Sequence, residues 1–197
     1  MKQTISEQTT SPRNRLLDVA ERLFSEQGYE AVTMRDIADA MGVRQASLYH
    51  HVPGGKQQLY VEVVERAMAR HRLALEQAVA SAGPHLRDQL LAASRWLLDH
   101  PPVDLVRMVN SDMPALSEEH SRRLTRLTFE ALLLPLASAF RTARERGEHN
   151  NPADLLLAGS FLAMMDAVQV GARFSSMTKD AMANNLIDTL LFGLLAR

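Results

Sequence analysis

The stretch from Arg15 to Tyr60 constrains the fold of this chain more than any other part. Its spacing of apolar and turn-forming residues predicts three short helices and the start of a fourth, and its centre, residues 33–52, has the layout of a helix-turn-helix. No Asp or Glu occurs in residues 40–61, whereas Arg, His and Lys do. A short helix with small polar residues in an acid-free segment suits a polyanion, so DNA binding is the leading hypothesis.

Local signals predict where these helices begin and end. Ser11-Pro12 is a typical helix start, with Ser as the cap and Pro at the first helical position, and Gly28 ends that first helix. Thr33 caps the second helix, with Asp36 three residues later as a variant capping box. Gly42 suits the left-handed residue that a tight helix-to-helix turn needs.

The rest of the chain also reads as helices, without repeats or a convincing strand. Breakers and apolar spacing predict helices at about 45–51, 56–82, 85–100, 103–111, 117–146 with a kink near Pro135, 152–174 and 178–195. The sequence therefore predicts an all-α fold of about nine helices. A disordered arm (1–10) precedes a three-helix helix-turn-helix domain (11–55), and a C-terminal helical domain (56–197) follows.

Composition limits the class of protein. Among the 197 residues, 46% are hydrophobic and only 5% aromatic, which favours packed helices. The net charge of −1 gives no whole-chain support to nucleic-acid binding, so any positive potential must be local. The chain has no Cys, which excludes disulfides and fits a reducing cytosol. The start of the chain is polar, and the apolar stretches 131–140 and 155–165 are too short to span a bilayer, so a soluble cytoplasmic protein is expected.

The N-terminal segment resembles the tetracycline-repressor (TetR) family of transcription regulators. The matching residues are Ala20-x-x-Leu23-Phe24, Gly28-Tyr29, Thr33-x-x-x-Ile37-Ala38, Gly42-Val43, Ser47-Leu48-Tyr49-x-His51-Val52, Lys56 and Leu59. The resemblance implies a cytoplasmic, all-helical homodimer whose helix-turn-helix binds a palindromic operator, usually to repress a gene. It also implies a C-terminal domain that binds a small molecule and thereby releases the DNA.

The resemblance assigns DNA contacts to particular residues. The third helix becomes the recognition helix, and Thr33 and Arg35 open the second helix beside phosphate. Lys56 takes the phosphate-contacting start of the fourth helix, although the turn before it is one residue longer than usual in the family. With Arg44, which is suited to guanine or phosphate, the predicted DNA-binding residues are Thr33, Arg35, Arg44, Gln45, Ala46, Ser47, Tyr49, His50, His51 and Lys56. Each alone could be an ordinary solvated residue, and together on one motif they favour DNA.

A stripe of small residues in the next-to-last helix predicts a dimer interface. Small residues every fourth position let another helix approach closely, while the opposite face, with Phe161 and Met165, meets the protein's own core. The last helix would complete a four-helix bundle with the partner. The predicted interface comprises Gly159, Ala163, Ala167, Val170, Gly171, Ile187, Leu190, Leu191 and Leu194. Close packing within one monomer is the alternative.

The C-terminal domain is rich in Met, which adapts to irregular ligands but is also common in plain cores. The family resemblance favours a pocket for an apolar or amphipathic effector. The candidate contacts are Arg95, Trp96, Met108, Asn110, Met113, Phe129, Met165 and Gln169.

Two other classes of protein remain as alternatives, a helical-bundle enzyme and a ligand-independent DNA-binding protein. The chain has no Glu-x-x-His pair, no Gly-x-Ser-x-Gly elbow and no Cys nucleophile, which argues against an enzyme. An architectural DNA-binding protein would not need the large second domain and usually carries a basic excess. His50 and His51 diverge on a helix and would not converge on a metal. No metal or cofactor is therefore expected.

Overall fold

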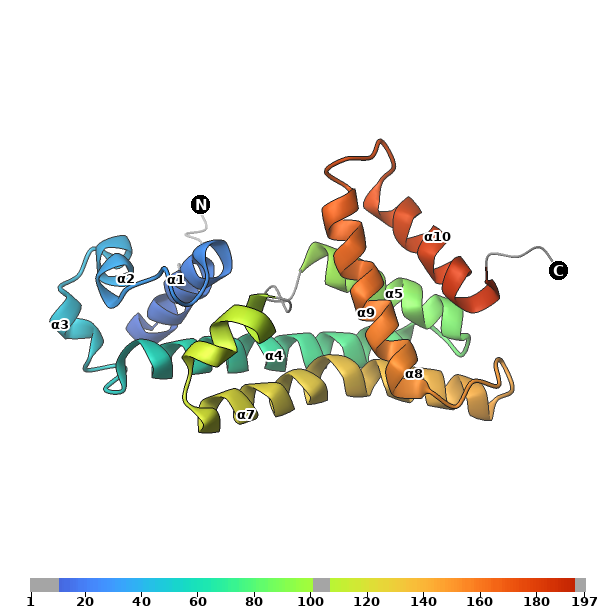
Figure 1. The fold of residues 1–197 in the computed structure, drawn as a ribbon, viewed down its shortest axis with the longest axis horizontal. Coiled ribbons are helices and arrows are strands. Elements are labelled where there is room, and N and C mark those ends of the chain that lie inside the picture. The colour runs from blue at the N-terminus through green and yellow to red at the C-terminus, as the bar shows by residue number, and fades with distance from the viewer. Residues whose placement is uncertain (1–10, 101–106, 194–197) are drawn as a thin grey trace, which may run out of the picture. The chain divides into compact units, whose positions relative to one another are not determined.

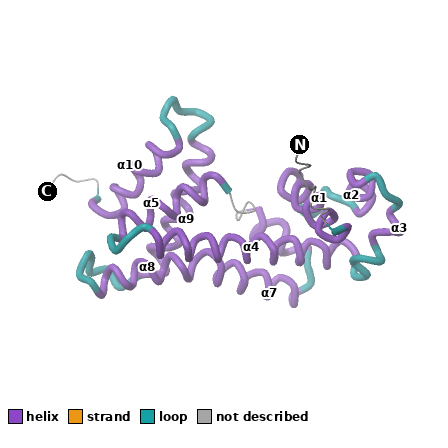
Figure 2. Tube along the Cα trace, turned by 180° about the vertical axis from the view of Figure 1, so that it is seen from behind, coloured by secondary structure: helices purple, strands orange, loops and turns teal. Residues whose placement is uncertain are grey.

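The computed structural model describes residues 11–100 and 107–193. This part of the chain is helical and contains no strand, which confirms the predicted all-α class (Figure 1). Two compact units share it: residues 11–66 with 107–124, and residues 67–100 with 125–193. The helices are joined mostly by short loops (Figure 2). The predicted arm (1–10), the start of the helix predicted at 103 and Leu194 lie outside the described residues.

The first unit begins with α1 (Pro12–Gln27) and α2 (Met34–Met41), whose ends are those predicted. The hydroxyl of Ser11 accepts a hydrogen bond from the amide of Asn14, and Gly28 ends α1 with φ at 87°. The capping box of Thr33 and Asp36 is formed in both directions, and Gly42 takes the left-handed conformation. These ends depend on residues at most four positions apart, which is why the sequence shows them.

The third helix is shorter than predicted. α3 (Gln45–Leu48) has four residues, and the carbonyl of Leu48 accepts hydrogen bonds from the amides of His51 and Val52 in a closing turn. Val52 is fully buried and precedes Pro53, and a residue before proline is disfavoured in helical conformation. The predicted end at residue 51 is therefore wrong by three residues.

The long α4 (Gly55–Ser81) contributes residues to both units and ends near the predicted break at Gly83-Pro84. The predicted boundary between domains, after residue 55, differs from the compact units. These assign the start of α4, as far as Arg66, and residues 107–124 to the first unit. The division into functional domains at 11–55 and 56–197 remains a prediction.

Two π-helical turns interrupt the regular α-helix, one just before the break that the sequence predicted at Met113-Pro114 and one just before the predicted kink at Pro135. A π-turn (Met108–Asp112) leads directly into a 3-10 turn (Met113–Ala115), which accommodates Pro114 near its start, where a missing N–H costs little. The long helix predicted at 117–146 is divided into α7 (Glu118–Thr128), a π-turn (Phe129–Leu133) and α8 (Leu134–Glu145). The amide of Leu134 donates to the carbonyl of Phe129, five residues back, just before Pro135. The interruption therefore falls where the kink was predicted.

The second unit is built from α5 (Leu86–Asp99), α8, α9 (Asp154–Gly171) and α10 (Lys179–Phe192). α9 packs against α8, and α10 packs against α5 and α9. Fully buried Leu90, Phe140 and Phe161 form the centre of this core. The ion pair of Arg87 with Asp188, at 2.7 Å, joins α5 to α10 at the surface.

Candidate nucleic-acid interface

A small buried scaffold holds α2 and α3 in the helix-turn-helix arrangement. Val32, Ile37, Met41 and Leu48 are all buried and point into the first unit. Across the turn, the amide of Val43 donates to the carbonyl of Ala38 at 3.0 Å. Because the core takes these apolar residues, the polar residues between them are left on the surface.

The exposed surface of this motif coincides with nearly all of the predicted DNA contacts. Tyr49 is 43% exposed, and the rest of the recognition segment except Leu48 is exposed as well. The exposed members of the predicted set are Thr33, Arg35, Arg44, Gln45, Ala46, Ser47, Tyr49, His50 and His51. The structure thus brings these nine residues together on the surface of one motif, with no acid between residues 40 and 61.

A carboxylate of the protein, that of Asp36, already occupies the N-terminal end of α2. The hydroxyl of Thr33 donates to the Asp36 carboxylate at 2.6 Å, and the Thr33 amide donates to the same oxygen at 2.8 Å. Hydrogen bonds from the side chain and backbone of Thr33 lower the pKa of Asp36, so this carboxylate is charged at neutral pH. Thr33 is therefore engaged in capping. Arg35, whose guanidinium lies 3.9 Å from Asp39 in an exposed pair, is the basic group available at this end.

Lys56 differs from the other nine predicted residues. Its side chain is half-buried, and its ammonium donates to the carbonyls of Tyr29 at 2.9 Å and Glu30 at 3.4 Å. The same ammonium lies 4.3 Å from the centre of the Tyr29 ring. In this structure Lys56 therefore holds the turn between α1 and α2, a role that the sequence did not indicate.

A buried cluster around Tyr29 was also not predicted. The rings of Phe24, Tyr29 and Tyr60 pack together, with centroids 4.9 Å apart for the two tyrosines and 5.1 Å for Phe24 and Tyr60. Asp112, only 2% exposed, accepts hydrogen bonds from the Tyr29 amide and the Tyr60 hydroxyl. Burial and the neighbouring Asp112 raise the pKa of Tyr60, which stays a neutral hydrogen-bond donor. Asp112 belongs to no local motif, so no signal in the neighbouring sequence indicates its role.

The eight predicted effector contacts are divided between the two units. Met108, Asn110 and Met113 belong to the first unit, and the two Met residues are buried in it. The other five belong to the second unit. Of these, Gln169 is already engaged, since its amide nitrogen donates to the carbonyl of Leu98 at 2.8 Å and its oxygen accepts from Lys179. The remaining four are Arg95, which is exposed, half-buried Trp96, Phe129 at 36% exposed, and buried Met165.

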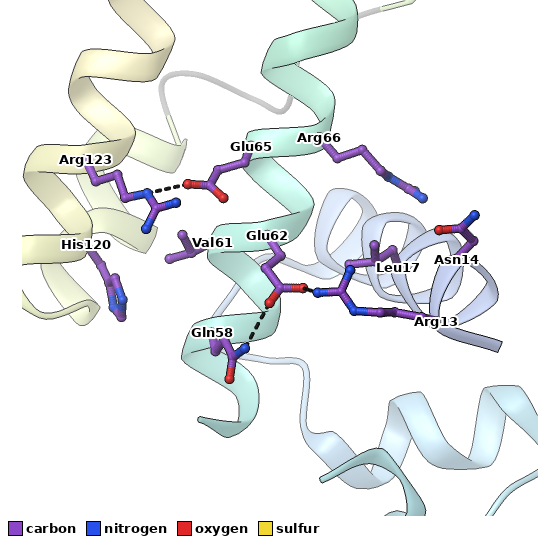
Figure 3. A pocket seen from close by; sticks show the side chains of 10 residues that line it. All are labelled: Arg13, Asn14, Leu17, Gln58, Val61, Glu62, Glu65, Arg66, His120 and Arg123. Atoms are coloured by element: carbon purple, nitrogen blue, oxygen red, sulfur yellow. Dashed lines mark hydrogen bonds and ion pairs between the residues drawn. The ribbon is translucent and has the colours of Figure 1, made fainter. Parts of the chain in front are cut away.

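Two hollows lie elsewhere, and none of those eight residues lines either of them. Within the first unit, a cavity of about 580 Å³ is bounded by α1, α4 and α7 (Figure 3). Charged pairs line it: Glu62 accepts hydrogen bonds from Arg13 and Gln58, and Glu65 pairs with Arg123. Within the second unit, a hollow of about 510 Å³ is lined by a mixture of apolar and charged residues. The charged cavity in the first unit does not fit the apolar pocket expected from the sequence.

The predicted dimer residues fall into exposed and buried groups. On α9, Ala163, Ala167 and Val170 are exposed, and Gly159 and Gly171 are half-buried. On α10, Leu190 and Leu191 are half-buried, whereas Ile187 is fully buried in its own unit and offers no surface to a partner.

α9 has an unusual amount of apolar surface for a core helix. Among the described helices it is the one long and apolar enough to cross a membrane, by length and composition only. Only 28% of this 18-residue stretch is buried, although Phe161, Met165 and Val168 on one side are fully packed. The apolar stretch expected at 155–165 is thus part of a longer helix that ends at Gly171. A core helix of a soluble protein passes the same test, and here one face is core while the other is uncovered in the single chain.

Comparison with known proteins agrees with the geometry of the motif. Residues 16–63 match the family described as bacterial regulatory proteins, tetR family. The HTH-type transcriptional repressor KstR2 of Rhodococcus jostii is 59% identical over 39 residues, which cover 20% of this chain and 19% of that protein. KstR2 of Mycobacterium tuberculosis is 34% identical over 107 residues, 52% of each chain. The matches thus span from about a fifth to about half the length of these relatives.

Solved structures match nearly the whole chain. The TetR family transcriptional regulator PfmR of Thermus thermophilus has a TM-score of 0.72 and 29% identity, over 92% of this chain and 100% of that one. AibR, solved with isovaleryl coenzyme A and operator DNA, has a TM-score of 0.73 at 22% identity, over 91% of this chain and 97% of that one, and shows likeness of fold alone. The family match, the relatives named as repressors and the fold of the solved structures all agree with the exposed helix-turn-helix found here. Residues 16–63 thus match the tetR family of bacterial regulatory proteins, and the helical fold matches that of a solved TetR family transcriptional regulator over nearly the whole chain.

Proposed function

We propose that this chain is a cytoplasmic, ligand-responsive repressor. In this proposal, a homodimer binds a palindromic operator through α2 and α3, and a small apolar or amphipathic effector releases it. The observation that carries the proposal is the acid-free surface of residues 43–51, whose polar side chains are exposed above a fully packed scaffold. The relatives described above are named repressors, which supports repression rather than activation.

Base reading is assigned to the start of α3. Gln45 is exposed at its first position and can pair with an adenine edge, and Ser47 can serve a base or a phosphate. Tyr49, beside buried Leu48, can place its hydroxyl against phosphate while its ring stays on the domain. Short side chains such as Ala46 let the backbone approach the major groove.

A binding assay on two DNAs separates these roles. Gln45→Ala should weaken operator binding by about 1–3 kcal/mol while binding to random DNA changes little. Tyr49→Phe should lower both affinities by similar factors, because a phosphate contact carries no sequence information. Equal losses on both DNAs for Gln45→Ala, or no loss on either, would contradict base reading by Gln45.

Dimerisation is assigned to the uncovered face of α9. Leu156, Ala163, Ala167 and Val170 follow one another at spacings of seven, four and three residues, which place them on one side of the helix. Leu156 and Val170 are 69% and 59% exposed. Phe174, just beyond the helix, is 87% exposed on the same spacing. A second copy of this face would cover these side chains, and the small residues between them allow two helices to approach closely.

Sedimentation of two matched variants tests this assignment. Ala167→Arg should give a monomer, because it places a charge between the paired helices, and operator affinity should fall with it. Leu73→Arg, at a 57% exposed position on α4, places the same charge on another helix and should stay dimeric. If Ala167→Arg sediments as a dimer, the interface lies elsewhere.

Effector control is supported by the size of the second unit and by AibR, which was solved with an acyl coenzyme A and operator DNA. A ligand that prefers the non-binding state lowers DNA affinity by the ratio of its affinities for the two states. Saturated fatty acids and their coenzyme A thioesters form a suitable panel for thermal shift, with operator release measured for each hit. Hits that stabilise the protein but leave operator affinity unchanged would refute the switch.

A further inference from the structure

We propose that Arg107 and Asp112, which lie outside the helix-turn-helix in sequence, are positioning residues for DNA reading. They hold the turn between α1 and α2, here called the Tyr29 turn (residues 28–30), and thereby set the orientation of α2 and α3. All the groups involved belong to the first unit. The inference rests on the proposed DNA binding.

Asp112 fixes the Tyr29 turn through hydrogen bonds to its buried carboxylate. Its carboxylate accepts from the Tyr29 amide at 3.0 Å and from the Tyr60 hydroxyl at 2.9 Å, one bond to each oxygen. The side chain is 2% exposed, so its charge is supported by these two donors and by the Arg107 guanidinium, 3.9 Å away. A buried carboxylate is costly unless it is fully engaged, which makes an alternative position of the Tyr29 amide unfavourable.

Arg107 is hydrogen-bonded to the C-terminal end of α1. One guanidinium nitrogen donates to the carbonyls of Phe24 and Ser25, both at 2.9 Å. The last carbonyls of a helix have no partner within the helix and carry the negative end of its dipole, so a cation is favoured there. Arg107 thus binds the last turn of α1, and Asp112 binds Tyr29, the first residue after Gly28.

Gly28 shows how closely these groups are fitted. Its φ of 87° is one that side chains with a Cβ rarely adopt, and a Cβ built there would touch Arg107 at 3.5 Å and Asp112 at 3.6 Å. The chain then passes through buried Tyr29 and Val32 to Thr33, which caps α2. The cap of α2, Thr33, therefore lies only four positions after Tyr29, whose amide is held, and this short connection limits how far α2 can move independently.

The consequence concerns specific binding more than general affinity. Reading bases requires α3 to sit in the groove in one orientation, whereas phosphate contacts on random DNA tolerate a range of orientations. Loosening the Tyr29 turn should therefore lower affinity for the operator while leaving affinity for random DNA nearly unchanged. A purely structural role for Arg107 and Asp112 would lower the melting temperature and change neither affinity of the folded protein.

The experiment compares wild type with Asp112→Asn and Arg107→Met in the full chain. Asp112→Asn keeps the shape and removes the charge, and Arg107→Met keeps much of the apolar stem and removes the donors. Arg123→Met is the control, because Arg123 belongs to the same unit and pairs with Glu65 on α4 instead of the Tyr29 turn. Affinities for operator and random DNA are measured at a temperature where circular dichroism shows every variant folded, with amide hydrogen exchange at Tyr29.

Both test variants should lose about tenfold in operator affinity, the factor typical of one lost base contact, with random-DNA affinity within about twofold of wild type. Their Tyr29 amide should exchange faster, and Arg123→Met should match wild type in all three measurements. Operator affinity equal to wild type in both variants would overturn the proposal, as would equal losses on the two DNAs. A wild-type chain that does not distinguish the two DNAs refutes the proposed function itself, a result obtained before any variant is compared.

Discussion

Replacing Lys56 by Met distinguishes a phosphate contact from a hold on the Tyr29 turn. The change removes a charged donor that reaches two carbonyls at 2.9 and 3.4 Å and lies 4.3 Å from an aromatic ring. A hydrogen bond to a charged group contributes about 1.5–3 kcal/mol, and a partly exposed cation–π contact adds about 0.5–1 kcal/mol. Solvent screens a half-buried ammonium, so we expect Lys56→Met to lower the free energy of unfolding by about 2 kcal/mol.

The salt dependence of operator binding provides the decisive assay. Each lost phosphate contact reduces the slope of log affinity against log salt by about 0.9, so a dimer that lost one contact per protomer would lose about 1.8. If Lys56 holds the turn, the slope of Lys56→Met stays within error of wild type while urea denaturation shows the loss of stability. Arg44→Met is the matched control. Arg44 is exposed, and its removal should reduce the slope and leave stability nearly unchanged.

The opposite pattern would refute this reasoning. A Lys56→Met variant with wild-type stability and a slope reduced by about 1.8 would show that Lys56 leaves the Tyr29 carbonyl and binds phosphate, as the family resemblance implies. Lys56→Arg helps to separate the cases, because it keeps the charge for phosphate but replaces the ammonium, with its compact fit over the Tyr29 ring, by a larger planar group.

Three further changes test other parts of the structure. Gly28→Ala should destabilise the chain by about 1–2 kcal/mol in urea denaturation, because its φ of 87° strains any residue with a Cβ; an unchanged midpoint would show that the turn rearranges freely. Phe161→Ala should cost about 3–5 kcal/mol, since the ring is fully buried between helices of the second unit, and a loss below about 1 kcal/mol would contradict that packing. The hydrogen bond from Arg144 lowers the pKa of Asp154 in the folded chain. The charged Asp154 therefore stabilises the fold at pH values above 3.8, its pKa in the unfolded chain, and this stabilisation is lost as the pH falls through the lower folded pKa. Asp154→Asn should therefore flatten the acid side of the stability profile, and an unaltered profile would contradict the pairing.

Features that arise from neighbouring residues could be predicted from the sequence. The cap at Ser11, the capping box of Thr33 with Asp36 and the left-handed turn at Gly42 all follow from contacts within four positions along the chain. Periodicity likewise separated the buried side of α9, with Phe161, from its uncovered face. Both kinds of signal are local, so one sequence is enough to show them.

Features that depend on distant contacts were missed. Asp112 and Tyr29 are 83 residues apart, and nothing near Asp112 indicates that its carboxylate is buried beneath a turn. Lys56 and Tyr29 are 27 apart, and an exposed phosphate contact was the simpler interpretation. Similarly, Gln169 resembled a pocket residue but is engaged by Leu98 and Lys179. Side-chain partners of this kind are set by tertiary packing rather than by spacing.

The most direct test of the central claim is footprinting of the full-length wild-type chain on the DNA that flanks its own gene, at fixed salt. We expect protection of an inverted repeat whose half-sites lie about one helical turn, or a multiple of it, apart, with affinity at least about a thousandfold above that for the same DNA scrambled. Equal affinity for native and scrambled DNA, or protection without two-fold symmetry, would contradict a homodimer that reads an operator through α2 and α3.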